Sequence, residues 1–375
     1  MLSLAAMFAV LGYASPATAE VKFGGDASVR LRGSFTDSEY NDNQYNNEDD
    51  LLFQYRVRLK ASADLGSGYF FKGMLQTEQA NGSTVIGGGW ADADDDISGI
   101  EISQFYFGRM MEDSHYMIGR LPLNSVNNPI FDITLYPIPT KAHDHSSGSY
   151  NQFGNTAVDI PVATWNFDRV FGLNYGRKIG PGELNSTLVV FDNATGDDSD
   201  LEGDGTFNDG YALHLSYKVN VGDITLEPQA IIGITDLDGA IYQNVSPNTF
   251  GMNVGIPAGK AKIGLSGFYT VCDDTNPNTN QHVDYSGYLL RIKGEYGPFT
   301  AWVDYNQTED NTASWESDYD NLFVWAQYNY KVYESAMGTF SLTPTVRYRS
   351  SGKEFGSSEY DESQLRTELY ATVTF

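Results

Sequence analysis

A histidine-rich triplet is spaced as metal ligands would be, and it is the first place to look for chemistry. His143 and His145 flank Asp144 in the 375-residue chain. A closed zinc site needs four ligands, and only the two histidines stand together here. We therefore interpret the triplet as part of a polar loop and predict no metal site there.

An acidic run further along the chain matches a calcium-binding loop in its first half only. Asp198, Asp200, Glu202 and Gly203 take positions 1, 3, 5 and 6 of an EF-hand loop. Position 12 is Asp209 where that motif has Glu, and no flanking helices are visible. We expect a solvated acidic loop that collects divalent ions loosely. The chain also lacks the G-x-S-x-G, H-E-x-x-H and P-loop motifs, so we predict neither a cofactor nor an enzyme.

Six basic residues in the first strand-like segments alternate with apolar ones. They are Arg30, Arg32, Arg56, Arg58, Lys60 and Lys72. A period of two places them on one face of consecutive strands, with apolar residues on the other face. A row of cations on a face that borders water favours anions.

The same alternation runs through almost the whole chain after residue 19. In 27–35, for example, Val29 and Leu31 share one face while Arg30 and Arg32 share the other. Sixteen such segments begin near residues 21, 51, 69, 99, 114, 164, 183, 210, 224, 248, 262, 284, 299, 320, 340 and 363. We predict sixteen antiparallel strands, each with one apolar and one polar face.

The connections between these segments alternate in length. Short ones contain the turn-forming stretches 64–68, 111–114, 180–182, 220–223, 257–260, 296–298 and 334–339. Long ones cover 36–50, 80–98, 121–163, 192–209, 236–247, 272–283, 306–319 and 350–362. A transmembrane β-barrel has this asymmetry, with short periplasmic turns and long external loops. A soluble β-sandwich also alternates, but it rarely reaches sixteen strands with strictly alternating loop lengths.

The N-terminus and the composition limit the class of protein. Residues 1–19 predict a signal peptide with cleavage after Ala19, although no Lys or Arg precedes the apolar run. The remaining domain, 20–375, contains no apolar run near the ~18 residues that suggest a spanning helix. A single Cys excludes a disulfide scaffold, and a pI near 4.3 argues against nucleic-acid binding.

Charge is divided between the long connections and the rest of the chain. The eight long connections contain 32 acidic and two basic residues, so their net charge is −30, whereas the net charge of the whole chain is −26. Strands and short turns together hold +4. A lipid-facing Arg at mid-membrane depth costs about 2–4 kcal/mol, so we expect the strand arginines to face an aqueous lumen.

Two stretches resemble the sixteen-stranded general porins of Gram-negative outer membranes. One runs from Arg58 through the turn Asp64-Leu-Gly-Ser-Gly68 to Gln79, and the other joins FYFGR (105–109) to IGRL (118–121). The resemblance covers about residues 55–121. It implies that loop 121–163 folds into the lumen, where Asp132, Asp144 and Asp159 face the basic wall, and that the protein forms a homotrimer.

The C-terminus also resembles a signal of outer-membrane proteins. Alternate residues from Leu365 to Val373 are mostly apolar, and the chain ends on Phe375. Such an end resembles the signal that the outer-membrane assembly machinery reads.

These observations lead us to expect a passive diffusion channel for small hydrophilic solutes in the outer membrane. Outer-membrane lipid and lipopolysaccharide would surround it. Three alternatives stay open: a substrate-selective channel, a secreted acidic β-protein that binds carbohydrate or calcium, and an outer-membrane hydrolase.

Overall fold

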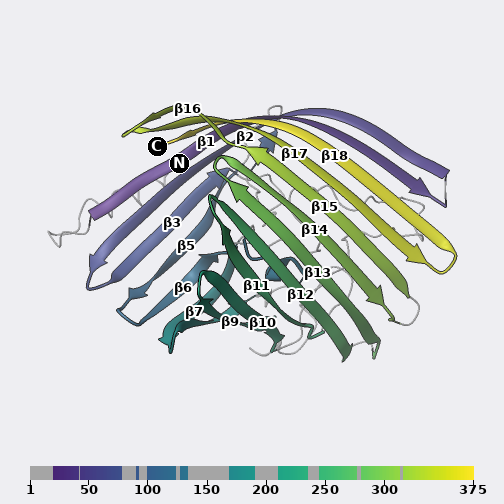
Figure 1. Cartoon of the computed structure of the whole chain (residues 1–375), viewed down its shortest axis with the longest axis horizontal. Coiled ribbons are helices and arrows are strands. Elements are labelled where there is room, and N and C mark those ends of the chain that lie inside the picture. Colours follow the sequence, from purple (N-terminus) through teal and green to yellow (C-terminus); the bar gives the residue numbers. More distant parts are fainter. Residues whose placement is uncertain are drawn as a thin grey trace, which may run out of the picture.

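The computed structural model describes residues 20–41, 43–77, 90–92, 99–123, 127–133, 169–190, 210–234, 245–276, 280–312 and 316–375. These residues form one antiparallel sheet of 18 labelled strands and a four-residue helix, α2 (Ile130–Ile133) (Figure 1). No helix in these ranges has the length and apolar composition needed to cross a membrane.

The strands follow one another along the chain with few interruptions. The first nine are β1 (Glu20–Tyr40), β2 (Asn43–Gly66), β3 (Tyr69–Thr77), β4 (Ala91–Asp92), β5 (Ile100–Met110), β6 (Ser114–Pro122), β7 (Arg169–Ile179), β8 (Gly182–Val190) and β9 (Tyr211–Val221). The other nine are β10 (Ile224–Gly233), β11 (Asn248–Ala258), β12 (Ala261–Thr275), β13 (His282–Tyr296), β14 (Phe299–Asp310), β15 (Ser317–Tyr328), β16 (Tyr330–Ser335), β17 (Gly338–Phe355) and β18 (Ser358–Thr374).

The sheet closes into a barrel because β1 pairs with both β2 and β18. β4 pairs with β2 just beyond the end of the β2–β3 ladder, and β16 pairs with β17 just beyond the β15–β17 ladder. Each of these two short strands therefore continues the wall position of the strand before it. Within the described ranges the 18 labelled strands thus fill sixteen wall positions, and the predicted sixteen-stranded barrel is confirmed.

All seven predicted short turns lie at one end of the barrel. Each joins its two strands through two or three residues, and both ends of the described chain lie at the same end, which we call the turn side. The β2–β3 turn requires glycine, since Gly68 has φ +82° and a Cβ there would lie 2.0 Å from the carbonyl oxygen of Met110. We call the opposite end of the barrel the loop side.

Two of the predicted long loops are wrong. Only residues 41–42 separate β1 from β2, and only 356–357 separate β17 from β18. The segments predicted as loops 36–50 and 350–362 are mostly paired strand, and Figure 1 shows these hairpins as long ribbons. Both faces of these extensions bear polar residues, so the apolar–polar contrast that reveals a strand disappears there.

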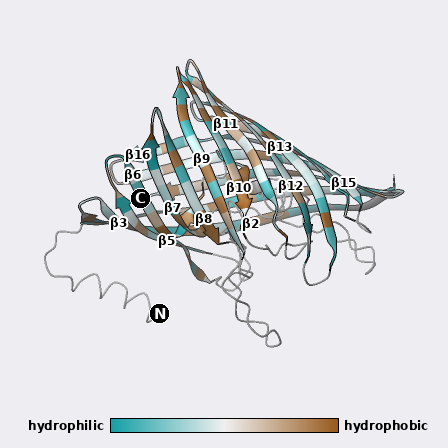
Figure 2. Cartoon of the chain, turned by 90° about the horizontal axis from the view of Figure 1, so that it is seen from below, coloured by the Kyte–Doolittle hydropathy of each residue, from teal (hydrophilic) through white to brown (hydrophobic). Residues whose placement is uncertain are grey.

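Burial in the barrel is the inverse of that in a water-soluble protein. Outward-facing Leu31 and Phe35 are each 45% exposed, whereas inward-facing Arg30 and Arg32 are only 2% and 3% exposed. Hydrophilic and hydrophobic residues interleave along the strands in Figure 2. The outer surface is therefore apolar, and the polar residues gather inside.

Candidate functional site

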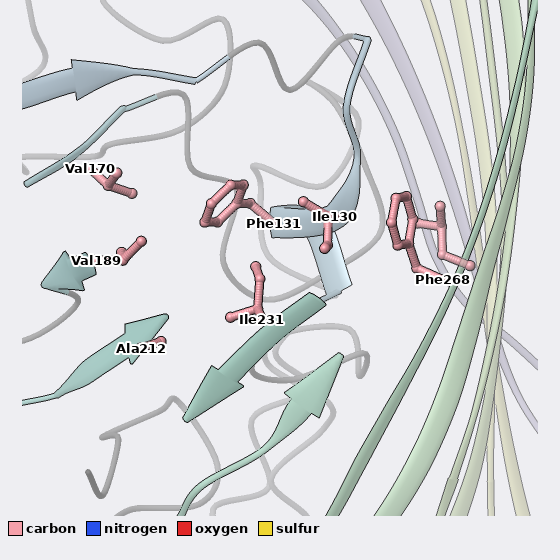
Figure 3. Close-up of a cluster of buried hydrophobic side chains, with 8 residues drawn as sticks. Ile130, Phe131, Val170, Val189, Ala212, Ile231 and Phe268 are labelled. Atoms are coloured by element: carbon pink, nitrogen blue, oxygen red, sulfur yellow. The ribbon is translucent and has the colours of Figure 1, made fainter. Parts of the chain in front are cut away.

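Residues 127–133 of the predicted loop 121–163 lie inside the barrel, whereas 121–122 belong to the wall strand β6. Ile130 and Phe131 of α2 are buried, and they pack against inward-facing wall residues (Figure 3). Those wall residues are Val170, Val189, Ala212, Ile231, Phe268 and Leu289. Burial of two large apolar side chains stabilises this position by roughly 3–6 kcal/mol, and it brings the segment against β7 to β13.

Hydrogen bonds to wall side chains also hold this segment. Asn128 and Gln229 form a reciprocal pair, with N···O distances of 2.9 and 3.0 Å. Asn253 donates to Asn128 Oδ1 at 2.9 Å, and His214 Nε2 donates to Gln229 Oε1 at 2.9 Å. Lys293 donates to Asn127 Oδ1. Three strands, β10, β11 and β13, thus bind the polar side chains of the segment directly, and His214 on β9 supports Gln229.

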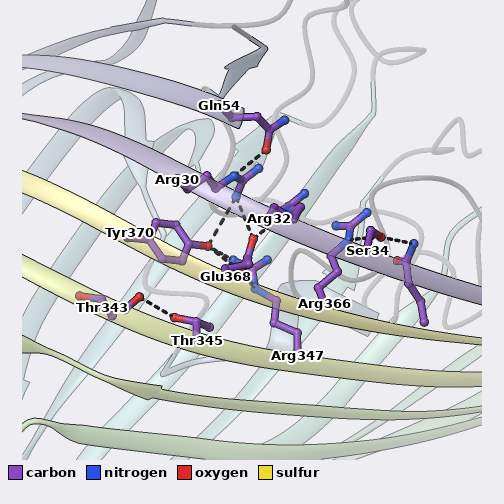
Figure 4. A network of polar contacts seen from close by, with 11 residues as sticks. Arg30, Arg32, Ser34, Gln54, Thr343, Thr345, Arg347, Arg366, Glu368 and Tyr370 are labelled. Carbon is purple, nitrogen blue, oxygen red and sulfur yellow. Dashed lines mark hydrogen bonds and ion pairs between the residues drawn. The ribbon is translucent and has the colours of Figure 1, made fainter. Parts of the chain in front are cut away.

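The wall formed by β1, β17 and β18 presents a cluster of guanidinium groups around one carboxylate (Figure 4). Arg32 Nε donates to Glu368 Oε1 at 2.5 Å, and Arg347 Nε lies 2.7 Å from Glu368 Oε2. Arg30 lies 3.5 Å from the same carboxylate, which is fully buried. Three cations share one anion, so these four residues have a net charge of +2. We call Arg30, Arg32, Arg347 and Glu368 the arginine cluster.

Hydrogen bonds with two neutral side chains complete the arginine cluster. Arg30 Nε donates to Gln54 Oε1 at 2.6 Å, and the Tyr370 hydroxyl donates to Glu368 Oε2 at 2.8 Å. The carboxylate therefore has the several hydrogen bonds that a buried charge needs.

Two further arginines on the inner wall are paired one to one with carboxylates. Arg291 donates to both oxygens of Asp304, at 2.5 and 2.7 Å, and Arg349 donates to Glu362 Oε1. These bidentate or charge-assisted pairs add no net charge.

Trp90, just before β4, lies between two of the predicted wall arginines. Its ring centroid is 4.2 Å from Arg30 Cζ and 4.6 Å from Arg56 Cζ, and its ring meets Tyr370 edge-on at 5.4 Å. The indole is 6% exposed. Such cation–π contacts are worth about 0.5–2 kcal/mol each, so the tryptophan fixes the orientation of both guanidinium groups.

The basic side chains become more exposed toward the turn side. Arg58 donates to Asp26 Oδ1 at 2.9 Å with its side chain 29% exposed, and Lys60 lies 3.6 Å from Asp26 with 53% exposed. Lys72 on β3 is also exposed. The structure thus brings Arg30, Arg32 and Arg56 together at mid-wall and places Lys60 and Lys72 nearer the turns.

The other predicted site residues have mixed placements. Asp132 lies within α2, whereas Asp144, Asp159 and both histidines of the triplet lie outside the described residues, as do 1–19 and 192–209. Phe375 is 55% exposed, and its backbone exchanges hydrogen bonds of 2.9 and 3.1 Å with Gly25. No group of three or more His, Cys, Asp or Glu residues suited to a metal occurs within the described ranges.

Sequence reasoning missed several members of the inner wall. Arg347, Arg349 and Arg366 alternate along β17 and β18 as Arg56 and Arg58 do along β2. That spacing was available as a signal. In contrast, nothing local marks Trp90 as a wall residue, because it stands in a segment that the sequence predicts as a loop.

Neither a protein-family model nor a curated protein sequence matches the chain. Its fold is similar to that of solved structures at low sequence identity. The anion-selective porin from Comamonas acidovorans superposes with a TM-score of 0.55 at 10% identity, over 94% of this chain and 99% of that chain. The outer membrane channel DcaP of Acinetobacter baumannii gives a TM-score of 0.53 at 15% identity, over 97% of this chain and 99% of that chain. Outer-membrane expressed OmpT of Vibrio cholerae gives a TM-score of 0.51 at 10% identity, over 95% of this chain and 99% of that chain. The chain thus has the barrel fold of outer-membrane porins and channels.

Proposed function

We propose that the chain is an outer-membrane channel through which small hydrophilic solutes and ions diffuse passively. The observation that supports this most is the inverted burial, with Leu51 70% exposed outside and Arg30 2% exposed inside. An apolar outer band and a polar interior suit a barrel whose outer face contacts lipid. A secreted acidic β-protein would have no reason to expose such a band to water.

The proposal assigns a place to each end of the molecule. The turn side faces the periplasm and the loop side faces outward, after residues 1–19 have directed export and been removed. Outer-membrane lipid and lipopolysaccharide surround the domain 20–375, and part of its apolar face is buried in a homotrimer. The assembly machinery reads the last strand with Phe375. No cofactor, metal or nucleic acid takes part, and the chain catalyses no reaction.

Selection among solutes would come from geometry and charge. The segment around α2 narrows the lumen on one side, with Asp132, Asp144 and Asp159 as candidate carboxylates. The opposite wall provides Arg30, Arg32, Arg56, Arg58, Lys60 and Lys72. A field between the two sides would orient and sort permeating ions.

Preference for anions is the second candidate function. The net charge of +2 on the arginine cluster favours it, and one solved structure with this fold is named as an anion-selective porin.

Planar-bilayer recording tests the channel directly. Purified protein should insert as discrete conductance steps, with a membrane pellet and heat-modifiable mobility as the controls for assembly. An absence of steps from correctly assembled protein would refute the proposal. Steps that respond to one nutrient class alone would favour the substrate-selective alternative, and turnover of lipid or peptide would reveal a hydrolase.

A further inference from the structure

A basic pocket lies on the inner wall near the turn side, apart from the arginine cluster. Its volume is about 380 Å³, and its lining includes Lys22, Lys60, Lys72, Gln104 and Tyr106. Lys60 and Lys72 are two of the six basic residues whose spacing predicts a place on the wall, and the structure adds Lys22 beside them.

The strand register brings the three lysines around a common centre. Lys22 on β1 is opposite Ser62 on β2, and Ser62 is opposite Lys72 on β3. Lys60 lies two residues further along β2, on the same face as Ser62. With about 4.8 Å between strands and about 7 Å between alternate residues, the three Cα atoms form a triangle with sides of roughly 8–10 Å. Flexible lysine side chains span such a triangle and can contact one small ligand together.

Small residues keep the centre of this triangle open. Ser62 lies between Lys22 and Lys72, and Gly24 lies opposite Lys60. A Cβ at position 24 would approach the backbone oxygen of Phe375 to 3.0 Å, so a larger residue is poorly accommodated there. Gln104 and the Tyr106 hydroxyl add neutral hydrogen-bond donors on the β5 side.

The charges around the pocket do not cancel. Glu20 lies 3.5 Å from Lys22, and Asp26 is shared between Lys60 at 3.6 Å and Arg58 at 2.9 Å. Lys72 packs over the Phe70 ring at 5.7 Å. The three lining lysines and Arg58 outnumber the neighbouring carboxylates of Glu20, Asp26 and Asp64, so the pocket keeps an excess of positive charge. The Lys22 and Lys60 side chains are 69% and 53% exposed, so their ammonium groups remain accessible.

We propose that this pocket binds a compact oxyanion with a charge of −2, such as inorganic phosphate. The three lining lysines carry the positive charge that a dianion needs, and lysine binds phosphate as a point charge while Gln104 and Tyr106 donate to further oxygens. The site lies between the arginine cluster and the periplasmic opening of the channel, and in that respect it rests on the proposed function. Binding itself does not require conduction.

Calorimetric titration of inorganic phosphate into the detergent-purified full chain at pH 8 tests the site. The wild type should bind phosphate, and the Lys60→Gln/Lys72→Gln variant should bind at least about tenfold more weakly, because two charge-assisted contacts are lost. Lys60→Arg/Lys72→Arg should keep most of the affinity. Lys178→Gln should leave binding unchanged, since Lys178 is an exposed turn-side residue that pairs with Asp113 at 3.2 Å. Nitrate, a monoanion, should bind far more weakly than phosphate.

Either of two calorimetric results would overturn the site. One is equal phosphate affinity in the wild type and the Lys60→Gln/Lys72→Gln variant, with heat-modifiable mobility showing both barrels intact. The other is an absence of phosphate binding to the wild type.

Bilayer recording separates this inference from the proposed function. Phosphate added on the turn side should reduce the chloride current of the wild type but not that of the Lys60→Gln/Lys72→Gln variant. If no chloride current appears at all, the channel proposal fails while calorimetry still decides the site. If chloride passes and phosphate has no effect on it, the binding inference fails and the channel proposal stands.

Discussion

Glu368 is the residue on which the arginine cluster depends, because Arg30, Arg32 and Arg347 all approach its carboxylate. Glu368→Gln removes the only negative charge of the cluster. Loss of one partner from a buried charged group typically costs about 3–5 kcal/mol, so we expect a clearly lower unfolding temperature in detergent. Glu112→Gln, at an exposed position in the turn between β5 and β6, is the matched control. Equal unfolding temperatures for Glu368→Gln and the wild type would contradict the assigned role of the carboxylate.

Phe375 presents a second test at the residue scale. Its side chain faces outward, so its deletion should lower the yield of assembled barrel in cells while leaving the conductance of assembled molecules unchanged. Tyr333→Ala removes another exposed turn-side aromatic and should assemble normally. A normal yield without Phe375 would show that the terminal residue is no assembly signal.

Residues differ in how far the sequence reveals them. Arg30, Arg32, Arg56 and Arg58 follow the period of their strands, so their inward placement is predictable. Their partners are not, because Glu368 lies 336 positions from Arg32 and meets it only when the barrel closes. Trp90 is less predictable still, since its position depends on how the chain returns to β2 at β4.

Among the elements, the segment around α2 owes its position to a few amide contacts and two apolar side chains. Asn128→Ala removes the acceptor of Gln229 Nε2 and of Asn253 Nδ2, at a cost of about 1–3 kcal/mol for each group that is left unsatisfied, while Gln229 Oε1 keeps its bond from His214. We expect a larger and noisier single-channel conductance. Asn220→Ala, at an exposed turn-side position, should record as the wild type does. An unchanged recording from Asn128→Ala would show that this segment does not narrow the conducting path.

The extended hairpins on the loop side concentrate carboxylates beyond the apolar band. Burial raises the pKa of Asp361 above its ordinary value, and Glu359, Asp320, Glu39 and Glu354 raise it further. A raised folded-state pKa means that the charged carboxylate costs stability at neutral pH. This cost disappears as the pH falls through the raised pKa.

Asp361→Asn should therefore raise the unfolding temperature at pH 7. The difference from the wild type should vanish below the ordinary pKa of an aspartate, where both are neutral. Asp223→Asn, in the exposed β9–β10 turn, should change little at either pH. A melting series that shows the same difference at both pH values would rule out charge as the cause.

The elements were predictable wherever the two faces of a strand meet different surroundings. All sixteen predicted segments overlap a wall strand, because one face of each strand forms the apolar outer band and the other face lines the interior. At the loop-side ends of β1, β2, β17 and β18 this difference is lost. The prediction therefore stopped those strands too early.

At the scale of the whole molecule, two opposed fields should set ion selectivity. The chain carries a net charge of −26. Most of its acidic residues lie in the predicted long connections, which join strands at the loop side, whereas the strands and short turns together carry +4. Acids that face bulk water are screened as the Debye length falls from about 30 Å at 0.01 M salt to about 3 Å at 1 M. Charges within the wall are screened less. Preference for cations should thus be strongest in dilute salt and should fall as salt rises.

The reversal potential under a salt gradient, recorded for the wild type and for Arg56→Gln/Arg58→Gln, tests the claim of a charged conducting wall most directly. The double substitution removes positive charge from the wall, so its reversal potential should shift toward cations at every salt concentration. Heat-modifiable mobility would establish that the variant barrel is intact. Reversal potentials that respond neither to salt concentration nor to the two substitutions would contradict the account, since the arginines would then not line the path of the ions.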